Sequence, residues 1–345
     1  MADAPAAGPS VSSAAPAQPS RAGRGRWASS LQFLVRRREL TVFVVTVAVI
    51  VYFSFANANF YDVPNIVTMV QYIAPIAVVG AGEVLLLVLA EIDLSAGQIF
   101  LTAPWVVYFA QHDGIPIGWA IVLALVFSVV VGVINGAFTV LLGVPSLIVT
   151  LGTSYALSGL VLVASSAEQF DMPGQTGEFG QLFGIGNWSE ITWALGIVAI
   201  LWVLLKKSRF GVHITASGGN LFGAAESGVR VGRVKIRCFM ILALVAGFIR
   251  ILDTIRIGSL DPSAPGLEVT LGAIVAAVIG GTALSGGRGT VLGTVIGAVF
   301  LGVLEDGFNL IGVNADWFIF AEGAAILVAM AVNVQLGKVA TRVRR

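Results

Sequence analysis

The residues of this sequence best suited to chemistry are acids and bases set within long apolar stretches. Burying such a side chain in hydrocarbon is costly, so it usually faces the inside of a helix bundle or a water-filled path. Arg250, Asp253 and Arg256 are spaced by three, which places them along one helical face and allows internal ion pairing. This stripe either lines a pathway or is the outer end of a helix that meets water. The other such residues are Glu83, Glu91, Asp93, Glu305, Asp306 and Glu322.

No pattern in the sequence indicates an enzyme. A GxxxxGK[ST] phosphate loop is absent, because the Gly337-Lys338 pair is followed by Val339. Cys238 is the single cysteine, which excludes a disulfide within the chain, and the two histidines lie far apart without companion ligands. We therefore expect no catalytic residue, no metal site and no cofactor bound by this chain.

The composition is that of a membrane protein. Of the 345 residues, 57% are hydrophobic and 11% are charged, whereas about a quarter of the residues in a soluble domain are charged. Roughly twenty apolar residues make one helical crossing of a bilayer, which predicts an all-α polytopic bundle of about ten transmembrane helices. The predicted spans are 40–57, 64–89, 94–111, 117–142, 146–165, 191–205, 236–256, 269–284, 290–308 and 317–334.

The basic residues predict the orientation of the bundle. Lysine and arginine concentrate in 21–38, 206–237 and 338–345, and short loops rich in these residues stay in the cytoplasm. Both termini and a loop at 206–235 are therefore expected on the cytoplasmic side. Residues 1–29, rich in Ala, Pro, Ser and Gly, are predicted to be a disordered cytoplasmic tail, which leaves 30–345 as the transmembrane domain.

Two similar strings, IDLSAG at 92–97 and TALSGG at 282–287, each follow one apolar run and open another. They are either an internal repeat, as transporters often contain near broken helices, or a chance similarity. In the first string, the carboxylate of Asp93 either caps the next helix or holds it against a neighbour, or else it contacts a substrate.

Four stretches of the chain closely resemble the ribose/xylose-type permeases of ABC importers, and they occur in the order typical of that family. The resemblance covers about 40–335. Branched-chain amino-acid permeases are more distant relatives that fit less well. The stretches are EIDLSAG at 91–97, PSLIVTLGT at 145–153, SGGNLFGAAESGV at 217–229 and AAVIGGTALSGGRGTVLGTVIGA at 276–298.

The resemblance implies a permease subunit in the bacterial inner membrane. It implies a second permease copy, ATPase subunits that bind ATP and magnesium, and a periplasmic or lipoprotein solute-binding protein that delivers a sugar or polyol. Membrane lipid surrounds the bundle, and no nucleic acid is expected as a partner.

The same resemblance assigns the segment from 218 to 228 to a coupling helix that docks on the ATPase. The residues agree with a short helix, because Asn220 can cap it and a glycine can end it. An ordinary amphipathic loop helix is the alternative. The residues of the motif are Gly219, Asn220, Ala224, Ala225, Glu226, Ser227 and Gly228.

The remaining site residues come from the other stretches. Arg288 is expected to anchor the cytoplasmic end of a helix. Small hydroxyl groups could handle a neutral polyol along a pathway, although in membrane helices they also serve packing. The turn residues are Asp93, Leu94, Ser95, Gly97, Ser285, Gly286, Gly287, Arg288 and Gly289, and the candidate pathway residues are Ser95, Ser146, Thr150, Thr153, Asp253 and Ser285.

Two other functions remain open at this stage. An ion-coupled secondary transporter would use Glu83, Asp93 or Asp253 and would need no ATPase. A membrane scaffold or receptor that transports nothing has little support, because the sequence has no sizeable soluble domain.

Overall fold

The computed structural model describes residues 38–174, 188–264 and 266–314, together with isolated helical positions between 180 and 327. Most of the described residues are helical, because in lipid a helix bonds its own backbone groups. The elements are α2 (Arg38–Ala56), η1 (Ala58–Tyr61), α3 (Val63–Val88), α4 (Ala96–His112), α5 (Ile117–Leu141), α6 (Ser146–Ala164), β1 (Phe170–Asp171), α8 (Ser189–Lys207), α9 (Arg209–Gly219), α10 (Leu221–Glu226), α11 (Val231–Ile257), β2 (Ser259–Leu260), α12 (Gly266–Ile279) and α13 (Val291–Leu310).

Seven of the described helices are long and apolar enough to cross a membrane, namely α2, α3, α5, α6, α8, α11 and α13. The predicted third and eighth spans correspond to shorter helices, since α4 has 17 residues and α12 has 14. The predicted end of the eighth span at 284 is wrong, because α12 ends at Ile279 and a glycine-rich turn follows. Glycine is compatible with an apolar run but is a poor helix former.

Some predictions fall on residues that the structure does not describe. The tail 1–29 and the basic end 338–345 lie wholly outside the described residues, and the tenth span, 317–334, lies mostly outside them.

The helices divide into central and peripheral ones. In α3, 83% of the 18-residue apolar stretch that could cross a membrane is buried, whereas the corresponding shares for α2 and α6 are 11% and 17%. The peripheral helices expose large apolar side chains, such as Phe55 on α2 and Val163 on α6. Such surfaces are rare on soluble monomers and suit contact with lipid.

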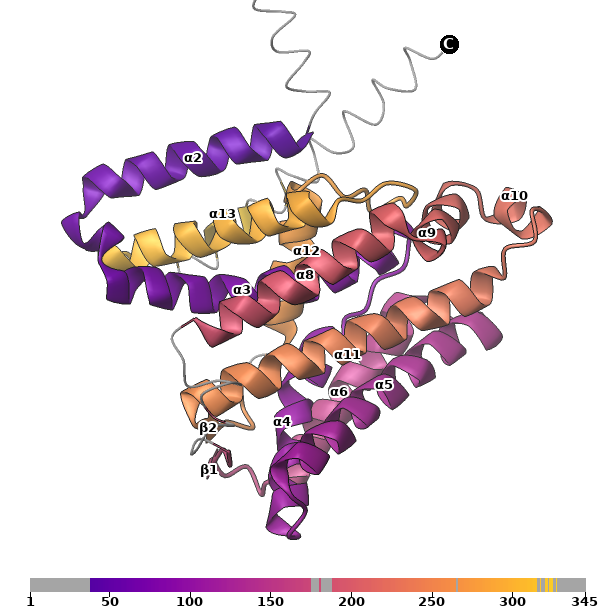
Figure 1. The fold of residues 1–345 in the computed structure, drawn as a ribbon, viewed down its shortest axis with the longest axis horizontal. Coiled ribbons are helices and arrows are strands. Elements are labelled where there is room, and N and C mark those ends of the chain that lie inside the picture. The colour runs from indigo at the N-terminus through magenta and orange to yellow at the C-terminus, as the bar shows by residue number, and fades with distance from the viewer. Residues whose placement is uncertain are drawn as a thin grey trace, which may run out of the picture. The chain divides into compact units, whose positions relative to one another are not determined.

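Figure 1 shows α3, α8, α11 and α13 running alongside one another, with α12 steeply across them. The crossing requires glycine where helices touch. A Cβ atom on Gly80 would lie 2.8 Å from Thr294 of α13 and 3.1 Å from the Ala273 carbonyl of α12, and one on Gly297 would lie 2.2 Å from the Ala276 carbonyl. Small residues of this kind let membrane helices pack closely.

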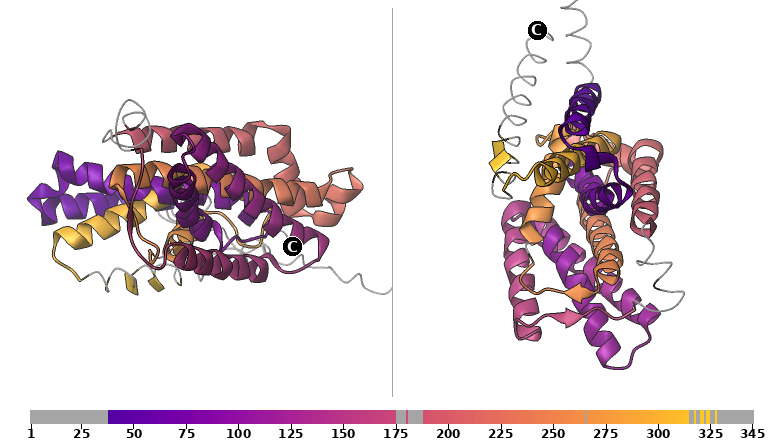
Figure 2. Two further views of the ribbon diagram at one scale, coloured as in Figure 1. Left: turned by 90° about the horizontal axis from the view of Figure 1, so that it is seen from below. Right: turned by 90° about the vertical axis from the view of Figure 1, so that its left-hand side faces the viewer.

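The short strands join two connections that are distant in sequence. β1 pairs with β2 in antiparallel fashion, with Phe170 opposite Leu260, and Figure 2 (right) shows the two arrows side by side. This pairing ties the segment after α6 to the end of α11. The strands therefore fix the end of α11 that carries Arg250, Asp253 and Arg256.

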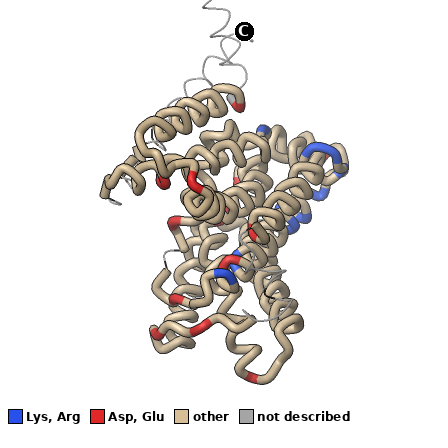
Figure 3. Tube along the Cα trace, turned by 60° about the vertical axis from the view of Figure 1, so that its left-hand side comes forward, with Lys and Arg blue, Asp and Glu red and all other residues tan. Residues whose placement is uncertain are grey.

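Charge is distributed unevenly over the described residues. Lysine and arginine gather around α9, α10 and the adjoining ends of α8 and α11, as the blue segments of Figure 3 show. A second, small basic group lies farther along α11, beside acidic residues. The first group is the described part of the predicted basic stretch 206–237.

Candidate functional site

In the turn between α3 and α4, residues 89–95, side chains satisfy the backbone donors of 92–95. The N–H of Ile92 donates to Ser146 Oγ at 3.2 Å, that of Leu94 to Thr150 Oγ1 at 3.0 Å, and that of Asp93 to Glu83 Oε1 at 3.0 Å. An unpaired N–H in a water-poor interior is costly. Ser146 and Thr150, which the sequence suggested for a pathway, therefore hold this α3–α4 turn against α6.

Asp93 organises the same turn from within. Its Oδ1 accepts the N–H of Ser95 at 2.8 Å and the Ser95 hydroxyl at 2.6 Å. The N-cap position of α4 is Ser95, so the expectation that Asp93 caps this helix is wrong. Its carboxylate instead closes a local turn two residues long, a geometry that aspartate side chains form readily.

A chain of hydrogen bonds leads from the turn into two neighbouring helices. Asn135 Nδ2 of α5 donates to Ser95 Oγ at 2.7 Å, and Thr153 Oγ1 of α6 donates to Asn135 Oδ1 at 2.6 Å. Thr153 was a pathway candidate, whereas Asn135 was missed. The sequence signal for Asn135 was an amide within the otherwise very apolar stretch that forms α5.

Two further contacts bind the start of α4 to distant helices. Lys235, near the start of α11, forms an ion pair with Glu91. The N–H of Gly97 donates to Thr270 Oγ1 of α12 at 2.7 Å, and a Cβ on Gly97 would lie 1.8 Å from the Gly266 carbonyl. Only glycine permits this meeting of the first turns of α4 and α12.

The turn between α12 and α13, residues 280–290, touches the α3–α4 turn. The N–H of Gly287 donates to the Val88 carbonyl at 2.8 Å. Gly286 and Gly287 have φ values of +84° and +75°, a conformation that favours glycine. Ser285 and Arg288 are exposed, and no helix-anchoring contact of the Arg288 side chain is seen among the described residues. The second of the two similar strings thus contacts the end of α3, just before the first string.

The last turn of α9 completes this junction. A Cβ on Gly218 would lie 1.7 Å from the Val88 carbonyl and 2.9 Å from the Gly287 nitrogen, whereas one on Gly219 would meet nothing within 4 Å. Gly218 is therefore the glycine that packing requires, whereas Gly219, one of the residues predicted for the coupling motif, is exposed. The α3–α4 turn, the α12–α13 turn and α9 meet at Val88.

Directly after this junction, α10 forms the predicted short helix. Asn220 Oδ1 accepts the N–H of Gly223 at 3.0 Å, so the predicted cap is confirmed. Gly228 has φ +84° just beyond the end of the helix, as expected for a terminating glycine. Ala224 is buried, whereas Ala225, Glu226 and Ser227 are exposed. Phe222 is 79% exposed, and it lies on a short helix that is not among the described helices long enough to cross a membrane.

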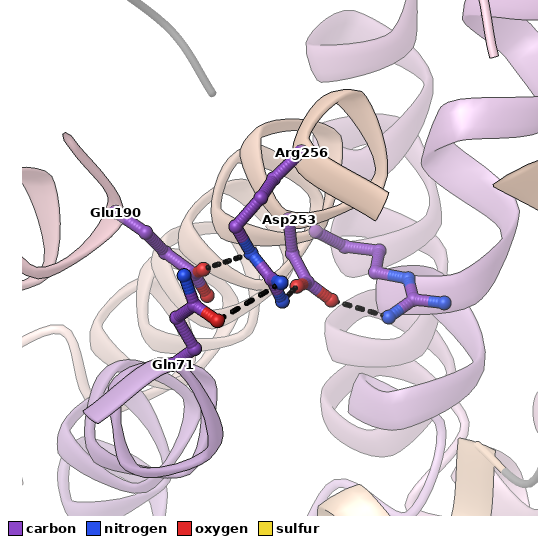
Figure 4. Close-up of polar contacts among 5 residues, drawn as sticks. Gln71, Glu190, Asp253 and Arg256 are labelled. Carbon is purple, nitrogen blue, oxygen red and sulfur yellow. Dashed lines mark hydrogen bonds and ion pairs between the residues drawn. The ribbon is translucent and has the colours of Figure 1, made fainter. Parts of the chain in front are cut away.

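The predicted ion-pairing stripe of α11 is confirmed and extends to other helices. Asp253 lies between two arginines, with Arg250 Nη1 and Arg256 Nη2 each 2.5 Å from one of its carboxylate oxygens. Arg256 also contacts Glu190 of α8 at 3.0 Å and Gln71 of α3 at 3.1 Å (Figure 4). The side chains of Asp253 and Glu190 are 6% and 1% exposed, so the stripe turns inward although it is near a helix end.

In this ion-pair cluster, two guanidinium groups face two carboxyl groups. Arg250 also lies over the ring of Phe100 in α4, 5.0 Å from its centroid, as in a cation–π contact. The cluster thus places paired polar groups beside an aromatic ring, among α3, α4, α8 and α11. Glu190 and Gln71 were not found from the sequence.

Comparison with known proteins gives consistent relatives. A family model described as a branched-chain amino acid transport system permease component matches residues 65–330. The chain is 35% identical to a xylose/arabinose import permease of Sulfolobus acidocaldarius, over 87% of this chain and 86% of that protein. It is 33% identical to a ribose import permease of Bacillus subtilis, over 85% and 91% of the two chains.

A galactose/methyl galactoside import permease of Escherichia coli is 32% identical, over 87% of this chain and 95% of its own length. The comparison with solved structures gives no match. The family match covers most of the chain, and these three relatives are all named as sugar import permeases. The resemblance found in the sequence is confirmed, and the chain belongs to this family of transport-system permease components.

Proposed function

We propose that the chain is the membrane-spanning subunit of an ATP-driven importer that moves a sugar or polyol. The main support is the exposed, capped helix α10, which directly follows the junction of three segments at Val88. The names of the relatives supply the solute class. In this proposal ATP and magnesium bind a separate ATPase, and a periplasmic or lipoprotein binding protein delivers the solute.

The proposal includes an orientation. The cations around α9 and α10 favour the cytoplasm for that end of the bundle. With about ten crossings, both termini would then be cytoplasmic, and the protein would reside in the bacterial inner membrane, paired with a second permease copy. Labelling of single cysteines from either side of sealed vesicles tests this orientation.

The coupling path follows from the junction at Val88. A force on α10 acts on the end of α9, where Gly218 lies against the Val88 carbonyl. The same carbonyl accepts the N–H of Gly287, so movement there reaches both the α3–α4 turn and the α12–α13 turn. Since close-packed contacts transmit displacement, ATPase motion would shift α4 and α13 together.

The ion-pair cluster is the proposed polar part of the pathway. A neutral polyol needs hydrogen-bonding groups and an apolar ring surface, and the guanidinium groups of Arg250 and Arg256 lie near Phe100 and Gln71. Because both guanidinium groups already pair with carboxyl groups, the cluster would offer no unpaired cation to an anionic solute. This assignment rests on the proposed function and adds no role for Ser146 and Thr150, which hold the turn.

The coupling proposal is tested with Phe222→Ala and a matched control, Trp119→Ala, which removes another aromatic side chain, 65% exposed. Aromatic side chains are frequent hot spots of interfaces, and truncating one often costs about 2 kcal/mol. Co-purified ATPase should fall by about thirtyfold for Phe222→Ala and stay unchanged for Trp119→Ala. An unchanged amount of ATPase with Phe222→Ala would remove the assignment of α10.

One observation supports an ion-coupled transporter as a second candidate. Glu83 Oε2 and Asp93 Oδ2 are buried and have no hydrogen-bond partner within the described part of the chain. Two such carboxyl groups could exchange a proton. Accumulation of solute by the chain alone in vesicles, driven by a proton gradient, would favour this candidate over the ATP-driven importer.

A further inference from the structure

An apolar groove lies outside the junction and the ion-pair cluster. It has a volume of about 730 Å³ and runs between the second half of α8, the start of α9 and the first part of α11. This volume is within the range of about 300–1,000 Å³ that is usual for ligand sites. The walls are formed mainly by Ile200, Val203, Phe210, Met240 and Ile241.

The bend between α8 and α9 creates the groove. Ser208 leaves the helical conformation, with ψ 157°, and its hydroxyl accepts the N–H of Gly211 to start α9. A Cβ on Gly211 would lie 2.0 Å from the Leu205 carbonyl, so the bend is tightly packed on its inner side. The two helices therefore diverge, and Phe210 lies beneath the opening.

The groove opens to the surroundings of the bundle. Ile200 and Val203 are 66% and 47% exposed, and both belong to α8, one of the helices long enough to span a membrane. Apolar side chains exposed at that depth face lipid chains. A hydrocarbon chain is therefore the chemistry that suits the walls.

The wall and rim of the groove carry positive charge. Arg237 lines the groove and is exposed, and Lys206, Lys207 and Arg209 follow at the α8–α9 bend. The sequence has no acidic residue from 191 to 225 or from 227 to 252. Glu91 pairs with Lys235, and neither residue lines the groove.

We propose that this groove binds one anionic phospholipid of the leaflet at the basic end of the bundle, with an acyl chain between α8 and α11 and the phosphate at Arg237. Arginine on a membrane helix extends its head toward the interface. Basic sites between membrane helices bind anionic head groups. A zwitterionic lipid satisfies the apolar walls equally well but not the excess of cations.

The test uses the full chain purified in detergent, stripped of lipid and mixed with phosphatidylglycerol or phosphatidylcholine of identical acyl chains. Native mass spectrometry counts the lipids that remain bound. We expect one retained phosphatidylglycerol. Retention should be about fivefold weaker in Arg237→Gln, because one basic residue near an anionic lipid surface strengthens binding by about that factor. Arg237→Lys should restore most of the retention.

Two variants separate a built site from general attraction. Arg233→Gln removes an exposed cation at the same end that does not line the groove, so the retained lipid should stay. Val203→Trp keeps every charge but fills the groove, so the retained lipid should be lost. These measurements need neither transport nor an ATPase, and they can fail while the proposed function holds.

Three outcomes would overturn the proposal. Equal losses in Arg237→Gln and Arg233→Gln would mean diffuse electrostatic attraction only. Equal retention of phosphatidylcholine would remove the anionic selectivity. A change from dimer to monomer in Val203→Trp, without loss of bound lipid, would mean that a second copy of the chain covers the groove.

Discussion

The two connections that meet at Val88 solve the same problem in different ways. The α3–α4 turn and the α12–α13 turn both interrupt apolar helices, and both must satisfy backbone groups in an interior poor in water. In the first turn, the donors of Ile92 and Leu94 bond to the hydroxyl groups of Ser146 and Thr150. In the second, Ala283 bonds to the Arg288 carbonyl.

The difference has consequences for what each turn tolerates. The α12–α13 turn depends on backbone conformation, with Gly286 and Gly287 at positive φ, and it needs few partners from other helices. The α3–α4 turn depends on side chains from α3 and α6, so its shape is coupled to the positions of those helices. A turn held by other helices can respond when they move, whereas a turn held by its own backbone moves as one piece.

The largest effect is expected from a substitution where both turns meet α9. Gly218→Ala places a Cβ 1.7 Å from the Val88 carbonyl, and the backbone cannot retreat cheaply. We expect a loss of about 3 kcal/mol or more in stability. Thermal unfolding in detergent measures it. Gly219→Ala is the matched control, because its Cβ would meet nothing within 4 Å, and a similar loss in both variants would contradict the assigned contact.

The α3–α4 turn is tested by removing one of its hydroxyl groups. Thr150→Val keeps the shape of the side chain but leaves the buried N–H of Leu94 without its acceptor. The expected cost is about 2 kcal/mol, with faster hydrogen exchange at the Leu94 amide. Thr68→Val provides the control, since among the described residues the Thr68 hydroxyl bonds only to the Pro64 carbonyl of its own helix. Unchanged exchange at Leu94 would show that Thr150 does not hold the turn.

The α12–α13 turn is tested by a substitution that strains its backbone. Gly287→Ala forces alanine to φ +75°, which should cost about 1 kcal/mol after the smaller entropy of the unfolded chain is included. Gly312→Ala introduces the same strain at φ +74° in open space. A Cβ on Gly287 would also lie 3.1 Å from the Cα of Gly219, so we expect a larger shift of the unfolding midpoint for Gly287→Ala than for Gly312→Ala, with a loss of ATPase co-purification for Gly287→Ala alone. Equal co-purification would separate this turn from coupling.

The sequence predicted what depends on neighbours along the chain. The spacing of Arg250, Asp253 and Arg256 predicted their ion pairs, because residues three apart share a helical face. The cap at Asn220 was predicted for the same reason, since its acceptor and donor lie within one turn.

Contacts between distant segments could not be predicted in this way. The hydrophobic pattern does not say that Asn135 meets Ser95 or that Glu190 meets Arg256. It also could not separate Gly218 from Gly219, because only the approach of Val88 distinguishes them. Ser146 and Thr150 were predicted as pathway candidates, with helix packing as the alternative, and their partners in the structure are backbone donors of a turn.

The smallest expected effect comes from Glu83→Gln, and it decides between a structural and a proton-carrying role for the α3–α4 turn. Glutamine keeps an oxygen that can accept the N–H of Asp93, so stability should change by less than about 1 kcal/mol. If the turn is structural, ATP-driven uptake of sugar by vesicles should persist and should not respond to an uncoupler. Asp93→Asn is the companion variant, since its remaining oxygen can still accept from Ser95. Loss of uptake in Glu83→Gln with unchanged stability would instead mean that the carboxyl group itself carries a proton.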